Sequence, residues 1–340
     1  MKAIQLLRYG HPDKCFKINE VPEPVPAENE VLIKVEFSGL NFADVVARRG
    51  LYPEAPKNPA VLGYDVVGTI EKINAKDSRF KIGDRVVALT RFGGYAEKVA
   101  TRIEGVALLP DNIDHAKATA LATQACTAYY ASAYLSRLRE GDNVLVHAAA
   151  GGVGSLICQI AKSKNCTVFG TASPSKHEYL KSIGVDHCID YRNNDFYSQI
   201  KSILGGHAID HAFDSVGGKT FRKSYKLLGP CGNIVSFGAA DQIHGNNKLK
   251  AILAAIGFGI FSPIQYLMLS KSLKTVNMLK VADHKPALFN HILNQVMLCV
   301  ENDIIEPKLD SVYNYQNIAE AHTRLESRKS IGKIVLDWTK

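Results

Sequence analysis

A glycine-rich turn between residues 144 and 163 joins an apolar strand pattern to a helical pattern. The strand would cover Val144–His147, and the turn that follows ends in Gly151-Gly152-Val153-Gly154. This is the dinucleotide-binding fingerprint with Ala149 at the place of its first glycine. Glycine at 151 lets the backbone approach a pyrophosphate, and glycine at 154 lets the helix pack closely on the strand. Because a helix N-terminus carries free N–H groups and a partial positive charge, we predict that Gly151, Gly152, Val153 and Gly154 hold a pyrophosphate.

The next strand pattern indicates which dinucleotide fits. Sites for NAD place an acidic residue about 20 residues after the fingerprint to hold the ribose 2′-hydroxyl. Here the second strand runs into Ala172-Ser173, and Lys176 follows, so its tip carries no carboxylate. A lysine attracts the 2′-phosphate of NADP, which a carboxylate would repel. We therefore predict NADPH rather than NADH, with Ser173 and Lys176 at the 2′-phosphate. The alternative is an ordinary solvent-facing Ser and Lys in the first helical turn.

The elements around this turn predict an α/β protein with two domains. Strand and helix patterns alternate from Asn143 onward, which is typical of a parallel sheet covered by helices on both faces. Residues 1–110 instead give short strand patterns separated by Gly and Pro turns, as in a β-rich domain. Near residue 283 the alternation ends. The expected strands are 31–37, 66–73, 85–89 and 95–99, then 144–147, 167–171, 187–190, 209–213 and 232–237, and finally 333–337 after a helix at 318–328.

Composition and charge narrow the class of protein. The 340 residues are 46% hydrophobic and carry a net charge of +8, from 41 Lys and Arg against 33 Asp and Glu. Because the basic residues are scattered, we interpret them as a solvated surface, and nucleic acid or anionic lipid is the less favoured partner. The seven cysteines form no CxxC pair and are odd in number, which argues against a disulfide framework and a cysteine-rich zinc lobe. Reduced thiols, and an N-terminal stretch unlike a signal peptide, lead us to expect a cytoplasmic protein.

Several motifs beyond the turn resemble one family. The run from Gly141-Asp142 through Gly154 to Gln159 and Lys162 resembles the signature of the quinone oxidoreductase (zeta-crystallin) branch of the medium-chain dehydrogenases. Residues 38–44 with 49–53, residues 83–86 and residues 332–336 resemble further motifs of that branch, so the resemblance covers nearly the whole chain. Residues 168–178 and 189–191 most resemble its vesicle amine transport protein subfamily.

The resemblance implies a fold and a set of site residues. It implies a GroES-like, β-rich catalytic domain from residues 1–120 and 283–340, and a Rossmann domain with a doubly wound parallel sheet at residues 121–282. The cofactor would lie in the cleft between the two domains. The site residues that it implies are Tyr191 beside the adenosine phosphate, Ser215, Phe237 and Gly238 at the nicotinamide half, Arg328 reaching in from the C-terminal segment, and Asn41, Tyr52 and Thr127 near the nicotinamide and the substrate.

Residue types at the matching metal positions predict chemistry without zinc. The zinc-dependent relatives use Cys, His and Cys, and the matching places here hold Asn41, Tyr64 and a residue near Thr123. None is a thiolate or an imidazole, the usual ligands of catalytic zinc beside carboxylates. Without a Lewis acid, we expect hydride transfer to a quinone or an α,β-unsaturated carbonyl rather than alcohol oxidation. Asn41 and Tyr52 are the candidate donors to the acceptor oxygen; the alternatives are a turn-stabilising asparagine and an interdomain packing tyrosine.

One uncharged segment leaves a second function open. Residues 251–269 carry no charge, but Gly, Ser, Pro and Gln interrupt them, and they fall inside the predicted nucleotide domain. We expect them to cap the substrate cleft or to pack at a homodimer interface, with Lys274–Met278 as the pairing strand; membrane contact is the alternative. Besides an NADPH-dependent oxidoreductase, the sequence thus allows an NADPH-binding protein that acts through lipid-membrane or RNA contacts with little turnover.

Overall fold

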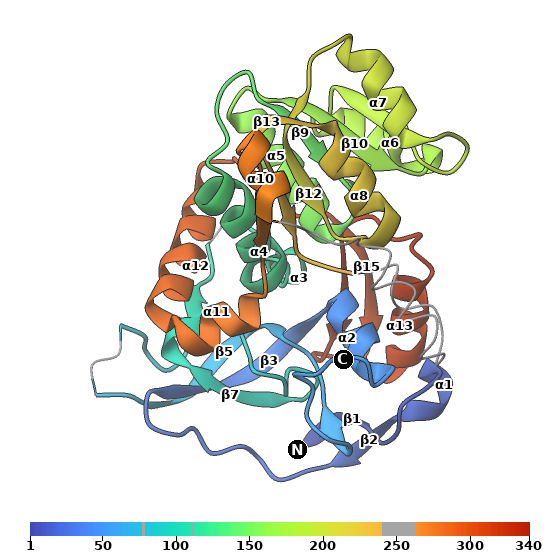
Figure 1. Ribbon diagram of the computed structural model, residues 1–340. Helices are drawn as coiled ribbons and strands as arrows, with labels where there is room; N and C mark the ends of the chain where they lie inside the picture. The colour runs from blue at the N-terminus through green and yellow to red at the C-terminus, as the bar shows by residue number, and fades with distance from the viewer. Residues whose placement is uncertain (77–78, 111, 240–262) are drawn as a thin grey trace. The chain divides into compact units, whose positions relative to one another are not determined.

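The chain forms two compact units (Figure 1). The structure, a computed structural model, describes residues 1–76, 79–110, 112–239 and 263–340. Unit 1 consists of Met1–Cys126 and Met278–Lys340, so it contains both ends of the chain, and unit 2 consists of Thr127–Asn277. The predicted domain limits at 120/121 and 282/283 lie within a few residues of these unit limits.

Unit 2 is built on a parallel sheet with the strand order of a Rossmann fold. Its six described strands lie in the order β11-β10-β9-β12-β13-β14, and every neighbouring pair is parallel. Counted along the chain this is 3-2-1-4-5-6, the order of a doubly wound dinucleotide-binding sheet, so that prediction is confirmed. The strands are β9 (Asn143–Val146), β10 (Thr167–Ala172), β11 (His187–Asp190), β12 (Ile209–Asp214), β13 (Leu228–Ser236) and β14 (Ser272–Thr275).

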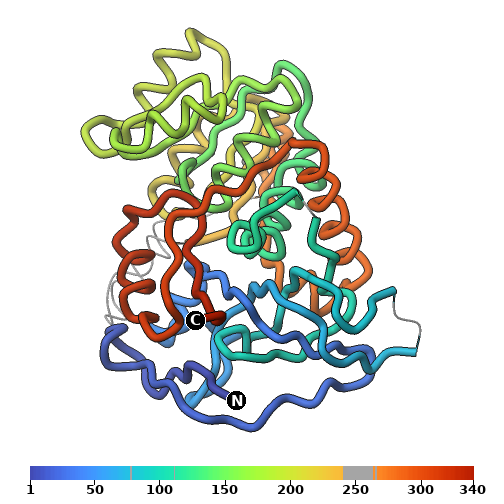
Figure 2. Tube along the Cα trace, turned by 180° about the vertical axis from the view of Figure 1, so that it is seen from behind, coloured from blue at the N-terminus to red at the C-terminus, as the bar shows by residue number. Residues whose placement is uncertain are grey.

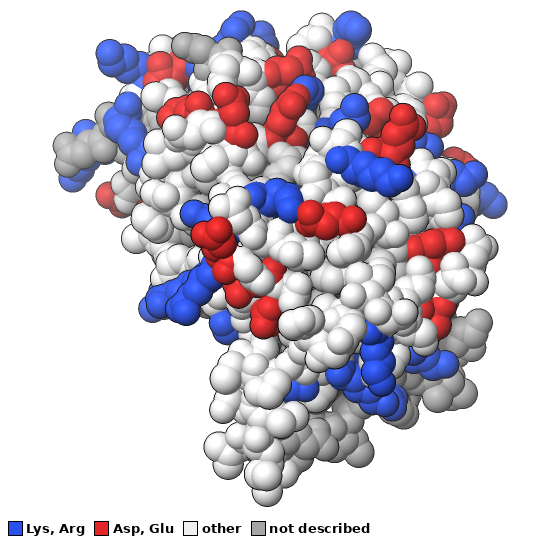
Figure 3. All heavy atoms as spheres, turned by 90° about the horizontal axis from the view of Figure 1, so that it is seen from above, with Lys and Arg blue, Asp and Glu red and all other residues white. Residues whose placement is uncertain are grey.

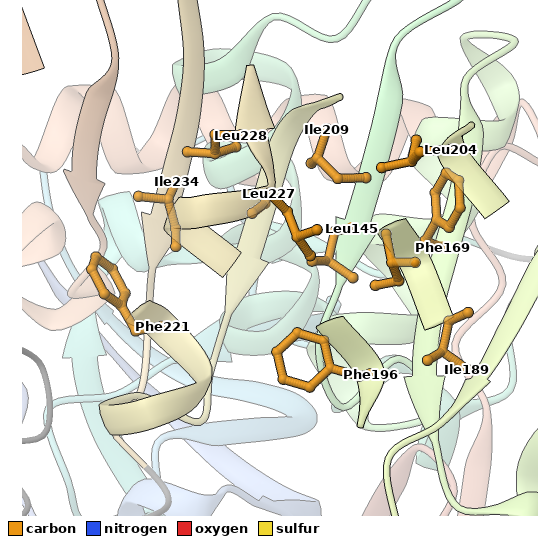
Figure 4. Close-up of a cluster of buried hydrophobic side chains, with 12 residues drawn as sticks. Leu145, Phe169, Ile189, Phe196, Leu204, Ile209, Phe221, Leu227, Leu228 and Ile234 are labelled. Atoms are coloured by element: carbon orange, nitrogen blue, oxygen red, sulfur yellow. The ribbon is translucent and has the colours of Figure 1, made fainter. Parts of the chain in front are cut away.

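The core of unit 2 joins this sheet to its helices. Figure 4 shows Leu145 of β9 and Phe169 of β10 in one cluster with Phe196 and Phe221, which come from helices. Because helices cover a parallel sheet on its faces, strand residues must be apolar with little alternation, as Val144-Leu145-Val146 is. The helices of the unit are α4 (Cys126–Tyr129), α5 (Gly152–Ser163), α6 (His177–Ser182), α7 (Phe196–Leu204), α8 (Gly218–Leu227) and α10 (Pro263–Leu269), α4 beginning one residue before the unit.

Unit 1 is β-rich and draws its main sheet from both ends of the chain. The described strands lie in the order β15-β16-β3-β5-β6-β8, with β7 also paired to β3, and a smaller sheet has the order β2-β1-β4. Strand β16 is antiparallel to β3, with Ile334 opposite Leu40, and Figure 2 shows the red C-terminal segment beside the blue one. The strands are β1 (Lys2–Leu6), β2 (Phe16–Glu20), β3 (Glu30–Leu40), β4 (Ala60–Val61), β5 (Asp65–Asn74), β6 (Arg85–Leu89), β7 (Lys98–Arg102), β8 (Val106–Leu108), β15 (Leu309–Asn314) and β16 (Lys333–Asp337).

The alternating patterns of unit 1 produce its core. Val31, Ile33 and Val35 point to one face of β3 and pack with Val66 and Ile70 of β5, as the period of two requires. Short helices connect or cover the strands. They are α1 (Pro12–Cys15), α2 (Phe42–Arg48), α3 (His115–Ala118), α11 (Met278–His284), α12 (Pro286–Glu301) and α13 (Ile318–Glu326).

Two strand predictions need correction, and β2, β4, β8 and β15 were not among the expected strands. The strand expected at 95–99 is β7, Lys98–Arg102, and the chain at Tyr95 instead accepts a hydrogen bond from the backbone of Ile4 at 2.9 Å. The strand expected at Lys274–Met278 has other bounds: β14 covers Ser272–Thr275, ends where its partner β13 ends, and is followed by α11 from Met278. Its role in pairing two subunits stays a prediction. Strand β15 was not expected, because its residues are only partly buried and show no clean alternation.

The uncharged segment is described only in part. Residues 251–262 lie outside the described residues, while α10 shows Ile264, Leu267 and Met268 exposed at 61%, 77% and 76%. Within the described ranges, no helix combines the length and apolar character needed to cross a membrane. Lys and Arg side chains lie among Asp and Glu over the face drawn in Figure 3, so the positive charge forms no single block there.

Candidate functional site

The turn after β9 has the backbone geometry that a pyrophosphate site needs. Helix α5 begins at Gly152 with Gly151 at its N-cap, so its free N–H groups open at the carboxyl end of β9. A Cβ at Gly154 would lie 2.5 Å from the carbonyl oxygen of Ala148. Ala148 has a left-handed backbone with φ of 50°, a conformation that strains any residue except glycine. The close approach requires glycine at 154, and the strain lies in the turn where the fingerprint predicts phosphate contact.

His147 ties this turn to two neighbouring elements. Its Nδ1 lies 3.1 Å from the hydroxyl of Thr171 in β10, and its Nε2 lies 2.7 Å from the hydroxyl of Ser224 in α8. Because the Ser224 hydroxyl donates to the carbonyl of Thr220 at 2.9 Å, it accepts from Nε2–H, and Nδ1 then accepts from Thr171. Burial lowers the pKa of His147, which keeps the imidazole neutral, as this arrangement requires.

The predicted 2′-phosphate residues lie at the ends of β10 and β11. The strands are parallel neighbours, with Ala172 opposite Asp190, so Ser173 and Tyr191 leave the sheet beside each other. Ser173 is buried, whereas Tyr191 is 46% exposed. Lys176 lies in a 3₁₀ turn, Pro174–Lys176, and not in the first turn of α6, which starts at His177. The tip of β10 carries Ala172 and no acid, as the preference for NADPH requires.

The residues predicted at the nicotinamide half follow β12 and β13. The backbone N–H of Phe237 donates to the carbonyl of Asp214 at 3.0 Å, and a Cβ at Gly238 would lie 2.7 Å from the carbonyl oxygen of Ser215. Because carboxyl ends of parallel strands share one edge, these residues lie at the edge that also carries the glycine-rich turn. The strand order reverses between β9 and β12, which is where doubly wound sheets bind ligands.

The predicted site residues divide between the two units. Unit 2 holds the predicted cofactor residues except one, and it includes the buried Thr127 of α4. Arg328 belongs to unit 1, where it follows the C-cap of α13 with a left-handed φ of 58° and an exposed side chain. Asn41 and Tyr52 also belong to unit 1.

The side chain of Asn41 is held in a buried polar network. Its backbone N–H donates to Asp44 Oδ2 at 2.8 Å at the start of α2, but the side-chain amide makes other contacts. Nδ2 donates to Asp65 Oδ2 at 2.6 Å, and Oδ1 accepts from Lys333 Nζ at 3.1 Å and from Gln124 Nε2 at 3.3 Å. Only 6% of Asn41 is exposed. The amide therefore takes part in this network, while Asn41 and Asp44 also form the capping box that begins α2.

A fully buried ion pair lies beneath Asn41. Lys333 Nζ and Asp65 Oδ2 are 2.5 Å apart, and neither side chain has any exposed surface. Lys333 is the first residue of β16, Asp65 is the first residue of β5, and both strands flank β3, which ends just before Asn41. Burying two charges costs desolvation energy that only close pairing and further hydrogen bonds offset. Strand pairing therefore fixes the cation and the anion on either side of the amide.

Tyr52 lies near the same network through its neighbour Tyr64. The two rings meet edge to face with centroids 6.4 Å apart. Burial raises the pKa of Tyr52 to about 12, and the carboxylates of Glu54 and Asp44 act in the same direction. The Tyr52 hydroxyl is therefore protonated at neutral pH and able to donate a hydrogen bond. Burial also raises the pKa of Asp44 to about 7, although the hydrogen bond from the Asn41 backbone opposes this.

Three residues of this network, Asp65, Lys333 and Gln124, were not predicted from the sequence. The available signal was a charged residue opening an apolar run, Asp65-Val66-Val67 and Lys333-Ile334-Val335, in strands otherwise built for a core. Gln124 lies in a π-helical turn, Leu121–Ala125, and its Oε1 is buried without a partner among the described residues. In the described part of the chain, no three His, Cys, Asp or Glu side chains are grouped as metal ligands would be.

Two family descriptions match the chain. Residues 27–111 match "Alcohol dehydrogenase GroES-like domain" and residues 152–278 match "Zinc-binding dehydrogenase". The "Synaptic vesicle membrane protein VAT-1 homolog" of Danio rerio is 35% identical over 338 residues, which cover 98% of this chain and 69% of that protein. The first match corresponds to the predicted GroES-like domain, and the second lies in the region of the Rossmann sheet.

Solved structures of three related proteins have the same fold along the whole chain. The human VAT-1 homolog-like protein has a TM-score of 0.86 at 30% identity, with 100% of this chain and 98% of that chain covered. Escherichia coli quinone oxidoreductase, complexed with NADPH, has a TM-score of 0.85 at 27% identity, with 99% and 100% covered. CurK enoyl reductase has a TM-score of 0.86 at 26% identity, with 99% and 98% covered.

Proposed function

Because the chain belongs to the zinc-independent quinone oxidoreductase branch of the medium-chain dehydrogenase/reductases, near the VAT-1 proteins, we propose that it reduces a quinone or an α,β-unsaturated carbonyl with NADPH. NADPH is its cofactor: the solved quinone oxidoreductase was crystallised with it, and the glycine-rich turn and the acid-free tip of β10 suit it here. The observation that carries the reductase proposal is the buried amide of Asn41, fixed among charged partners in unit 1.

The proposed roles in the reaction follow from hydrogen-bonding capacity. Bound NADPH supplies a hydride from the nicotinamide C4. Negative charge would then develop on the acceptor oxygen, where hydrogen-bond donors lower the barrier, and the reduced acceptor would take up its proton from water. Asn41 has one Nδ2–H left after its bond to Asp65, and Tyr52 keeps its hydroxyl proton at neutral pH. We assign both as donors to the acceptor oxygen, with Thr127 near the substrate and Arg328 at the cofactor.

A screen of NADPH oxidation tests the proposal. Purified protein is assayed by absorbance with a panel of quinones and enones, alongside Asn41→Leu and Tyr52→Phe. We expect turnover with at least one acceptor and a loss of about tenfold or more in kcat for Asn41→Leu, as when an oriented donor is removed. NADPH binding without turnover on any acceptor would reject the reductase and favour a binding protein.

We also propose a homodimer that pairs through the edge of the unit 2 sheet. Strand β14 has a partner on only one side among the described strands, and α10 next to it exposes Ile264, Leu267 and Met268. A second subunit that covered the unpaired sheet edge and the exposed apolar surface would stabilise both. Sedimentation should show a dimer in wild type, and Leu267→Asp should shift it toward monomer because the carboxylate would be desolvated.

The same exposed residues are the observation that favours the alternative, a protein acting at a lipid membrane. The name of the Danio rerio relative refers to a vesicle membrane. Flotation with anionic liposomes separates the two possibilities. We expect wild type to remain unbound as a dimer. Flotation of wild type that Leu267→Asp abolishes, without any change in oligomeric state, would support the membrane surface instead. A cytoplasmic location stays a prediction that rests on the seven cysteines, none of which forms a disulfide bond in the described part of the chain.

A further inference from the structure

The buried amide of Asn41 has only one orientation that its neighbours permit. In the orientation found, Lys333 and Gln124 donate to Oδ1, and Asp65 accepts from Nδ2. A flipped amide would place its NH₂ group against an ammonium and its carbonyl oxygen against a carboxylate. Both contacts would be repulsive between side chains that are almost fully buried. The charges of the ion pair therefore act directly on the direction of the amide.

The side-chain amide of Gln124 is held in one orientation for the same reason. Its Nε2 donates to Asn41 Oδ1 at 3.3 Å, so a flip of this second amide would place two carbonyl oxygens together. Gln124 is 8% exposed, and its Oε1 has no partner within the described residues. The ion pair thus fixes the orientation of the Asn41 amide, and the Asn41 amide fixes the orientation of the Gln124 amide. After these bonds are made, Asn41 keeps one Nδ2–H and Gln124 keeps its Oε1 acceptor.

We propose that the Lys333–Asp65 pair is a positioning device that fixes Asn41 as a donor only, which suits the site to ligands whose reacting oxygen accepts a hydrogen bond. This inference rests on the proposed reductase and specifies how Asn41 acts in it: because Lys333 and Gln124 occupy Oδ1, the amide has only an N–H to offer to the negative charge that develops on the acceptor oxygen. Lys333 and Asp65 act through Asn41 and do not themselves touch the substrate.

An apolar replacement of the pair tests this without leaving an unpaired charge. In Lys333→Met with Asp65→Leu, both charges disappear together, and buried ion pairs replaced in this way are often neutral for stability. We expect an unchanged melting temperature, an unchanged Kd for NADPH and a kcat lower by about tenfold or more. In an Asn41→Leu background the same double change should cost less than about twofold, since its effect passes through Asn41.

A second ion pair of unit 1 supplies the matched control. Arg324 donates to both carboxylate oxygens of Asp310 at 3.0 Å, and the Asp310 side chain is 5% exposed. Neither residue contacts Asn41 in the hydrogen bonds described above. Because the Ile331 N–H also donates to Asp310 Oδ1 at 2.8 Å, the control keeps an acceptor there: Arg324→Met with Asp310→Asn should retain the wild-type kcat. A full kcat in the Lys333–Asp65 double variant, or losses that multiply with that of Asn41→Leu, would overturn the proposal.

Nuclear magnetic resonance of the amide gives a readout that needs no turnover. The Nδ2 signals of Asn41 are assigned by their loss in Asn41→Leu. In wild type we expect two well-separated proton signals protected from exchange, because one proton bonds to a carboxylate at 2.6 Å. The Lys333–Asp65 double variant should lose both the separation and the protection, and unchanged signals would reject the positioning role. If wild type turns over no acceptor but the signals behave as expected, only the reductase proposal fails.

Discussion

Gly39 leaves the space that the buried ammonium of Lys333 occupies: a Cβ at residue 39 would lie 2.3 Å from Lys333 Cε and 2.7 Å from Nζ. Gly39→Ala should therefore push the ammonium away from Asp65 and Asn41 without removing any polar group. We expect a loss of about 1–3 kcal/mol in the free energy of unfolding, as for overpacking elsewhere, and a lower kcat for quinone. Denaturant titration and the NADPH assay measure the two effects. A variant with wild-type stability and kcat would show that the Lys333 side chain accommodates the added methyl group without losing its contacts to Asp65 and Asn41.

Cofactor selectivity should depend on Lys176. With Ala172 and not an acid at the tip of β10, NADPH should bind more tightly than NADH by about 1–3 kcal/mol, the worth of a charge-assisted contact to the 2′-phosphate. Fluorescence titration with both cofactors measures the difference. Lys176→Ala should remove most of it, whereas Lys181→Ala, a control on the neighbouring helix α6, should leave it intact. Equal affinities of wild type for the two cofactors would contradict the assignment.

Burial and distance along the chain decide which parts of the fold and of the candidate site could be predicted from the sequence. Alternation predicted β3, in which Lys34 and Glu36 are more exposed than Ile33 and Val35. Strand β6 and the buried strands of unit 2 were visible as apolar runs. The glycine-rich turn was predictable because a close backbone approach permits few residue types. The partners of Asn41 were not, because Asp65 and Lys333 are 268 positions apart and only the pairing of β16 with β3 brings them together. The bounds of β14 depend on its pairing with β13, which the local sequence pattern of residues 272–278 does not reveal.

The residue types at the positions that match the zinc ligands of the zinc-dependent relatives predict that the protein holds no zinc. Asn41 and Tyr64 stand where the resemblance places a thiolate and an imidazole, and Lys333 already supplies a positive charge to Asp65. Purified protein should hold far less than one zinc per chain by elemental analysis. Treatment with a chelator should leave NADPH-dependent turnover unchanged. Stoichiometric zinc that survives dialysis, or activity lost to a chelator and restored by zinc, would contradict this.

Acid should destabilise the protein through His322. The ring is fully buried against Phe16 and Tyr95, with centroids 4.7 and 6.2 Å away, and burial lowers its pKa to about 3, with the Arg48 charge adding to the effect. The unfolded chain binds this proton below a pH of about 6.5, so stability is retained above that pH and lost as the pH falls. At pH 5 the expected loss is about 2 kcal/mol.

The control for this prediction is His322→Phe, which keeps an aromatic ring in the same place but cannot take up a proton. Asp44, whose pKa burial raises to about 7, acts in the opposite direction, since a protonated carboxyl favours the fold as the pH falls. That contribution is common to both proteins and cancels in the comparison. Melting temperatures from pH 7 to 4 should therefore fall more steeply for wild type than for the variant, and parallel curves would rule out His322 as the cause.

The pairing of β16 with β3 also sets an order of events during synthesis on the ribosome. Asn41 and Lys333 are 292 positions apart, so at ~5–20 residues per second roughly 15–60 s pass before Lys333 is made. Throughout that interval the sheet of unit 1 lacks a strand beside β3, and Asp65 lacks its cation. Unit 2 is continuous and is complete much earlier, so it is free to fold first. Strand β16, which is made after all of unit 2, therefore closes the sheet of unit 1 and sets the direction of Asn41.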